Sequence, residues 1–249
     1  MKRLLAIFAV GLLCCCKPKA ESFSELRSKA EKGNTRAQAK LGFAYFEGEG
    51  VPQDDVEAMK WIRKAADQGD SEAQLVCGEM YLHGNGVLKD DVEGMKWIRK
   101  AADQGDAVAQ GKLGFAYLNG VGVRKDEIEA LKWMRKAADQ GDAVSQTNLG
   151  KAYTNGKGVL KDDVEAVTWY RKAAGQGDDA AQLMLGFAYA LGEGVPKDEA
   201  QAYKWWLLAG AQGNDTAKKA YTSHERFLTP EQRAEGQRMA REFKPVKLK

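Results

Sequence analysis

The hydrophobic positions of the chain recur as pairs of helical stripes. Ala37, Leu41 and Tyr45 stand four residues apart, so a helix from about residue 35 to 47 would carry them on one face. A second stripe begins at Ala58 and continues with the same helical spacing. Short turns that contain two glycines separate the stripes. The pattern therefore predicts an all-α chain, well over half helical, built from units of two helices each.

The pair of stripes repeats at a fixed period of 36 residues. Ala37-Gln38 returns as Ala73-Gln74, Ala109-Gln110, Ser145-Gln146 and Ala181-Gln182. The segment WIRKAADQGD at 61–70 returns at 97–106, then as WMRKAADQGD at 133–142, WYRKAAGQGD at 169–178 and WWLLAGAQGN at 205–214. Five copies thus tile residues 34–213. Such a period predicts a stack of repeats in which each unit buries its apolar face against its neighbours.

The turn between the two helices of each copy has the form GxGV, first as GEGV at 48–51. Paired glycines also occur in phosphate-binding loops, but a dinucleotide loop needs a preceding strand and a third glycine that opens a helix. Here the motif follows a helix, lacks the third glycine, and leads to Asp54, whose negative charge would repel phosphate. We interpret the motif as a hinge in which Gly48 ends the first helix and Gly50 reverses the chain.

Other recurrent positions predict helix contacts and helix ends. Gly42 and its copies lie inside the first helix, where glycine costs about 1 kcal/mol relative to alanine, so we expect the second helix to pass too close there for a side chain. Asp54 and Glu57 predict a capping box at the start of the second helix, in which each side chain bonds the other residue's backbone amide. Gly69 predicts a left-handed end to that helix.

The whole motif, AQxxLGxxYxxGxGVxxDxxxAxxWxRKAADQGD, resembles the Sel1-like repeat, a relative of the tetratricopeptide repeat. The resemblance covers residues 34–213. It implies a right-handed α-solenoid of helix-turn-helix repeats, and it implies that the protein binds other proteins.

Both ends of the repeat array are expected to be capped by helices. Residues 17–33 are predicted to form an N-terminal capping helix, because FSELRSKAEKG at 23–33 resembles the second helix of a preceding repeat. Residues 214–249 are predicted to hold a degenerate repeat and a C-terminal capping helix. Thr229 and Gln232 predict a capping box at the start of that last helix, which would cover the final repeat.

Residues 1–16 are predicted to be an export signal. A basic pair, Lys2 and Arg3, precedes ten apolar residues, a run too short to span a bilayer but suited to a secretory signal. The run ends in three consecutive cysteines, which resembles a bacterial lipoprotein box and makes Cys16 the candidate for lipidation. Plain secretion is the alternative. Both versions predict an exported protein, in the periplasm or anchored to the outer membrane, and only the lipoprotein version gives it a membrane contact, through a lipid anchor.

Charge and cysteine content narrow the class of partner. The formal net charge is +3, and 36 basic residues face 35 acidic ones once Lys2 and Arg3 are removed with the leader. A nucleic-acid partner would require a concentrated basic surplus, so we expect none. Cys77 has no partner outside the leader, so a disulfide framework is excluded. Because the other copies carry leucine at its place, Cys77 is predicted to be a small core residue.

No catalytic signature accompanies the repeats. SxxK, GxSxG and HExxH are absent, and neither His83 nor His224 has a second His or Cys at ligand spacing. We therefore predict a non-enzymatic protein without catalytic residues, cofactor or metal. A β-lactamase-like or cell-wall hydrolase is the least favoured alternative, because the cysteine-rich relatives linked to β-lactam hydrolysis carry a disulfide in each repeat.

The candidate binding surface is the face of each first helix opposite its buried stripe. This face varies between copies whereas the rest is nearly constant, and in related solenoids it lines the concave side. The predicted partner-binding residues are Arg36, Lys40, Phe43, Glu47, Glu72, Glu79, His83, Lys112, Phe115, Asn119, Asn148, Lys151, Asn155 and Phe187. Aromatic anchors among mixed charges are typical of interfaces. In the alternative interpretation, the phenylalanines only fill grooves between neighbouring helices.

The leading function hypothesis is a protein-binding solenoid of the bacterial envelope. Resemblance to exported Sel1-like proteins makes it, most specifically, an immunity protein that binds and neutralises a toxin delivered by type VI secretion, lipases included. An envelope adaptor or a host-interaction factor is the alternative.

Overall fold

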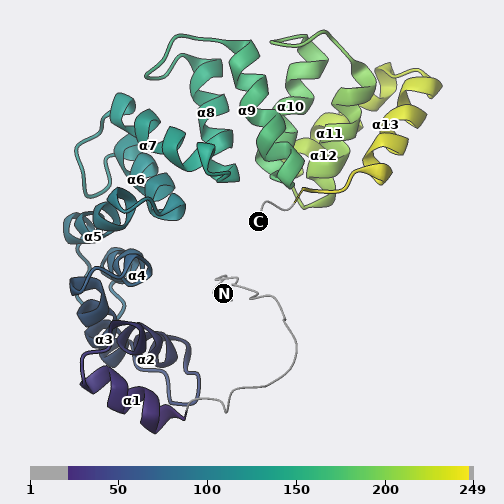
Figure 1. The fold of residues 1–249 in the computed structure, drawn as a ribbon. Coiled ribbons are helices and arrows are strands. Elements are labelled where there is room, and N and C mark those ends of the chain that lie inside the picture. The colour runs from purple at the N-terminus through teal and green to yellow at the C-terminus, as the bar shows by residue number, and fades with distance from the viewer. Residues whose placement is uncertain (1–21, 247–249) are drawn as a thin grey trace.

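The computed structural model describes residues 22–246, in which short turns join a series of helices (Figure 1). The described chain forms 13 α-helices and one short 3-10 helix, with no strand between residues 22 and 246. The elements are α1 (Phe23–Glu31), α2 (Thr35–Glu47), α3 (Asp55–Asp67), α4 (Ser71–His83), α5 (Asp91–Asp103), α6 (Ala107–Asn119), α7 (Glu127–Asp139), α8 (Ala143–Asn155), α9 (Asp163–Gln176), α10 (Asp179–Leu191), α11 (Glu199–Ala211), α12 (Asp215–His224), η1 (Glu225–Phe227) and α13 (Pro230–Glu242). The predicted signal peptide and Cys16 lie outside the described residues.

The helices form a solenoid because each packs against its neighbours along the chain. Within each repeat the two helices pack against each other, as α2 does with α3, and the second helix then packs against the next repeat, as α3 does with α4. Figure 1 shows the helices following one another along an arc, with α2, α4 and α6 on its inner side. The predicted all-α solenoid is confirmed.

Glycines inside the first helices bring the two helices of each repeat into close contact. A β-carbon added to Gly42 would lie 2.7 Å from Cγ1 of Ile62, and one added to Gly78 would lie 2.6 Å from Cγ1 of Ile98. A β-carbon at Gly114 would likewise lie 2.6 Å from the side chain of Met134. All of these distances are too short for real carbon atoms, so the predicted close approach is confirmed.

The GxGV turns join the helices of one repeat and also touch the repeat before. Gly48 has the left-handed backbone (φ 75°) that ends α2, and its amide donates to the carbonyl of Ala44. The second glycine of the next turn, Gly86, lies against the backbone carbonyl of Asp55, where any side chain would overlap that carbonyl. Gly50, in the first turn, has no such contact within residues 22–246. The hinge is therefore also a contact between repeats.

The predicted capping box at the start of the second helices forms only in part, and the predicted bond from the Glu57 side chain is wrong. Oδ1 of Asp54 accepts the amides of Val56 and Glu57 at 3.0 Å, as predicted. The amide of Asp54, however, donates to the carbonyl of Tyr45 at 3.0 Å and closes the turn. Because that amide is already bonded, the Glu57 carboxylate instead accepts the indole N–H of Trp61 at 3.2 Å. Glu93 and Glu165 bond the tryptophans of their own helices in the same way.

A spine of glutamines runs through the solenoid and joins three helices at each step. Nε2 of the buried Gln74 in α4 donates to the carbonyl of Ala66 in α3 at 3.1 Å. Nε2 of Gln104, the residue that caps the end of α5, donates in turn to Oε1 of Gln74 at 2.7 Å and to the carbonyl of Gly69 at 3.1 Å. Later repeats show the glutamine pairs Gln110–Gln140, Gln146–Gln176 and Gln182–Gln212.

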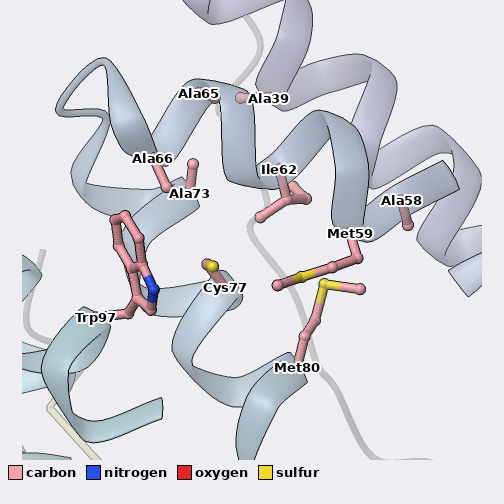
Figure 2. Close-up of a cluster of buried hydrophobic side chains, with 10 residues drawn as sticks. All are labelled: Ala39, Ala58, Met59, Ile62, Ala65, Ala66, Ala73, Cys77, Met80 and Trp97. Carbon is pink, nitrogen blue, oxygen red and sulfur yellow. The ribbon is translucent and has the colours of Figure 1, made fainter. Parts of the chain in front are cut away.

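The core between successive repeats is built from alanines and a few large side chains. Figure 2 shows one such cluster, in which Cys77 of α4 lies between Trp97 of α5 and the two methionines Met59 and Met80. The Cys77 side chain is fully buried, and this burial raises the pKa of its thiol to about 12. Its predicted role as a small core residue is confirmed, because a neutral thiol behaves there as an apolar group.

The helices at both ends of the array pack against the outermost repeats. Nε2 of Gln38 donates to the carbonyl of Ala30 in α1 at 3.0 Å, so α1 takes the place that a second helix takes elsewhere. At the other end, Thr229 and Gln232 form the predicted capping box of α13. Helix α13 packs across α11, and Gly236 allows it to approach the carbonyl of Ala200.

Replacing Gln110 by leucine should destabilise the whole stack. The variant removes two hydrogen bonds, a buried one to the carbonyl of Ala102, which keeps only the amide of Gly105 as a donor, and a partly buried one from Gln140, which keeps only the carbonyl of Gly105 as an acceptor. We expect a loss of about 1–3 kcal/mol in the free energy of unfolding, measured by urea denaturation. Gln53→Leu is the matched control, since Gln53 is exposed and bonds only Asp55, and it should change the stability little.

Deleting one full period should leave a folded, shorter solenoid. Removal of residues 106–141 joins Gly105 to Asp142, which repeats the natural Gly105–Asp106 junction and keeps every helix pair intact. Removal of 106–125 instead takes away α6 and leaves α7 without its partner helix. Circular dichroism melting should show one cooperative transition for the first variant only. Equal loss of structure in both variants would contradict the modular packing described above.

Candidate functional site

The predicted partner-binding residues lie on the first helices α2, α4, α6, α8 and α10, and their burial differs. The three phenylalanines occupy the same repeat position. Phe115 is 54% exposed, whereas Phe43 is half-buried and packs against the cluster of Figure 2. Phe187 is also half-buried, with its ring edge-on to Trp206 at a centroid distance of 5.3 Å. Only one of the three therefore presents most of its ring to solvent.

The polar candidates divide into exposed charges and side chains bonded to their own helix. Nζ of Lys112 in α6 lies 2.8 Å from Glu79 in α4, so this ion pair bridges two repeats. His83, Asn119 and Asn155 each bond the backbone carbonyl one turn earlier in the same helix. The remaining candidates with exposed side chains are Arg36, Lys40, Glu47, Glu72 and Lys151, and Asn148 is partly buried.

A hollow of about 440 Å³ lies over α6 and α8, in the middle of the solenoid. Three predicted residues line it together: Lys112, Phe115 and Asn148. Its other lining residues are Leu82, Met95, Val108, Gly111, Ala116, Val121, Asp142, Val144 and Ser145. The hollow has the size of small-ligand sites, although it is open on one side.

Most of the lining is apolar, and its charged groups already have partners. Val108, Phe115 and Val144 are exposed apolar residues around the hollow. The ammonium of Lys112 is paired with Glu79, and Oδ2 of Asp142 accepts the amide of Ser145 at 2.7 Å as the cap of α8. The arrangement therefore suits an uncharged, apolar group.

The sequence prediction missed Gly111, although a signal was present. The equivalent residues of the other repeats are Ala39, Leu75, Thr147 and Leu183, so Gly111 is the copy without a side chain. Comparison of the copies position by position, rather than of their shared motif, would have singled it out.

Two further structural findings concern chemistry and membranes. Among residues 22–246, no group of three or more His, Cys, Asp or Glu side chains is placed to hold a metal ion. Within the same range, no helix has both the length and the apolar character needed to cross a bilayer.

The repeats match a known family model along most of the chain. The model of the Sel1 repeat matches residues 35–70, 71–106, 107–142, 143–178 and 179–214. A sequence relative, the secretory immunoglobulin A-binding protein EsiB of Escherichia coli O6:H1, is 39% identical over 63 residues, which are 24% of this chain and 13% of EsiB.

Solved structures share the fold. The structure of c5321, described as a protective antigen present in uropathogenic E. coli strains, has a TM-score of 0.79 and 39% identity over 88% of this chain and 48% of its own. A Sel1 repeat protein of Oxalobacter formigenes has a TM-score of 0.76 and 36% identity, covering 88% of this chain and 89% of its own. The immunity protein Pa5087 of Pseudomonas aeruginosa, at 19% identity, a TM-score of 0.50 and coverage of 84% and 81%, shares the fold alone.

The chain spans about half the length of c5321 and a smaller part of EsiB. The family match nevertheless covers well over half of this chain and falls on the five helix pairs of the solenoid. Sel1 repeats typically form non-catalytic scaffolds for binding between proteins. On the strength of these matches and of the helix packing, the chain is a member of the Sel1 repeat family.

Proposed function

We propose that this chain is an exported, protein-binding solenoid of the bacterial envelope whose partner binds the inner face around Phe115. The observation that carries the proposal is the exposed Phe115 ring at the edge of the apolar hollow, beside the Lys112–Glu79 ion pair. A large aromatic side chain that is more than half exposed has little to contribute to the fold. It can, however, serve as an anchor in an interface.

The contrast between constant and variable positions supports the same proposal. The glutamines, glycines and alanines between the helices are nearly the same in every repeat, because packing requires them. The repeat position of Phe115 instead carries Phe, Glu, Phe, Lys and Phe in the five copies. A fixed scaffold with a varying face is what recognition of a specific, asymmetric partner requires.

Two partner classes follow from the proposal. The first is a toxin delivered by type VI secretion, such as a lipase, which the protein would bind and neutralise in the envelope. The second is a host protein, and the local 39% identity to a protein named for binding secretory immunoglobulin A favours it. A hydrolase is the least supported function, because Asp54 and its copies act as helix caps.

Phe115→Ala should weaken partner binding and leave the fold intact. Loss of an aromatic anchor typically costs about 2 kcal/mol or more of binding free energy, or roughly thirtyfold in affinity. Binding would be measured with purified secretory immunoglobulin A, and with proteins captured from envelope extract of a strain that carries type VI toxins. The melting temperature of the variant should remain close to that of the natural protein, because Phe115 is mostly exposed.

Trp97→Ala is the matched structural control. Trp97 is buried against Cys77 in Figure 2, and its truncation should cost about 3–5 kcal/mol of stability. Phe43→Ala should lie between the two, since its ring is half-buried. A large fall in melting temperature for Phe115→Ala would instead show that this ring serves the fold.

Processing at the leader is a separate prediction. We expect cells that express the whole sequence and are grown with an alkyne analogue of palmitate to carry the label on the processed protein, and we expect Cys16→Ser to abolish the label. Fractionation of the same cells checks export. Recovery of unprocessed protein in the cytosol would contradict the proposed envelope location.

A further inference from the structure

The repeat position that holds Ala39, Leu75, Thr147 and Leu183 lies at the junctions between neighbouring first helices. The longer of these side chains show what a filled junction contains. Leu75 packs against the buried cluster that includes Ala109, and Leu183 packs against the cluster that includes Ala217. Oγ1 of Thr147 donates to Asp178 at 3.0 Å. In each case a side chain of the first helix reaches toward the next first helix.

At the junction between α6 and α8 the same position is Gly111, and no side chain fills it. The facing residue of α8 also differs from its equivalents, since it is Ser145 where the other copies carry alanine. A β-carbon added to Gly111 would lie 2.9 Å from Oγ of Ser145 and 3.3 Å from Oδ2 of Asp142. The hydroxyl of Ser145 thus takes the place next to the backbone, and the space that a longer side chain would occupy belongs to the hollow.

A glycine at this place costs stability and leaves room for the hydroxyl of Ser145. Glycine inside a helix is less stable than alanine by about 1 kcal/mol. The glycines at 42, 78 and 114 allow a close approach of two helices, whereas the three atoms nearest to a β-carbon added at Gly111 all belong to side chains. Its absent side chain instead enlarges an apolar hollow beside Phe115.

We propose that this hollow receives a leucine-sized aliphatic side chain of the protein partner, which takes the place that Leu75 and Leu183 take at their own junctions. The inference rests on the proposed function and names the group that its partner presents. The lining favours such a group, because Val108, Val144 and Phe115 offer apolar contacts. A charged group would find Lys112 already paired with Glu79.

The test fills the hollow with the residues of another junction. The double variant Gly111→Leu/Ser145→Ala copies the Leu75–Ala109 arrangement, so it should fold and melt at or above the temperature of the natural protein. The probe is a phage-displayed library of random 16-residue peptides, selected on the natural protein. We expect selected peptides to share one Leu, Ile or Met, and alanine at that place to reduce affinity by roughly tenfold to a hundredfold.

The double variant should bind a selected peptide with an affinity that is lower by the same factor. Replacing the aliphatic residue of that peptide by alanine should not lower this affinity further. Val144→Lys provides a second variant that leaves the core unchanged, because Val144 is exposed at the rim of the hollow. This variant should also weaken binding of the selected peptide. If the double variant fails to fold, Val144→Lys alone decides the question.

Three results would overturn the inference. The first is that the selected peptides share no aliphatic residue. The second is that a selected peptide binds the natural protein and whichever variant folds with equal affinity. The third is that no peptide is selected at all. None of them decides the proposed function, which is tested separately by the effect of Phe115→Ala on the whole partner. If Phe115→Ala weakens that partner and the filled hollow does not, the interface stands and the aliphatic anchor is wrong.

Discussion

The amide of Gln74 and its copies, buried at the centre of each junction, must find hydrogen-bond partners, and the rest of the solenoid depends on how it does so. A buried amide without partners costs several kcal/mol, so only one placement of three successive helices is acceptable. In that placement Gln74 donates to the carbonyl of Ala66 and accepts from Gln104. Alanine cores alone could slide, whereas these bonds fix each repeat against the next.

The fixed spacing of the helices explains the composition of the repeats. Once the glutamines hold the helices close together, Gly42 and Gly78 must lack side chains, and alanines must fill the remaining core. The turn is equally constrained, because Gly86 touches the backbone of the preceding repeat. Nearly every inward-facing position is thereby assigned to packing. The positions of the first helices that face away from the core of their own repeat are free of this constraint, and there the copies differ.

Departures from the repeat are therefore more informative about binding than the repeat itself. Phe115 and Gly111 lie one helical turn apart in α6, and both border the same hollow. Ser145, across the junction, is the matching change in α8. The packing of the helices places these groups side by side, so the proposed partner would meet a preformed surface.

The sequence by itself determined the period, the helices, their caps, the close approach at Gly42 and the core place of Cys77, because each depends on residues near one another along the chain. Tertiary structure decided the rest. The amide of Asp54 bonds Tyr45 across the turn, and so no full capping box forms. Phe43 and Phe115 share one repeat position but differ in exposure, since their surroundings come from other helices. The hollow lies where α6 and α8 meet, and a pattern read along one helix contains no information about the space between two.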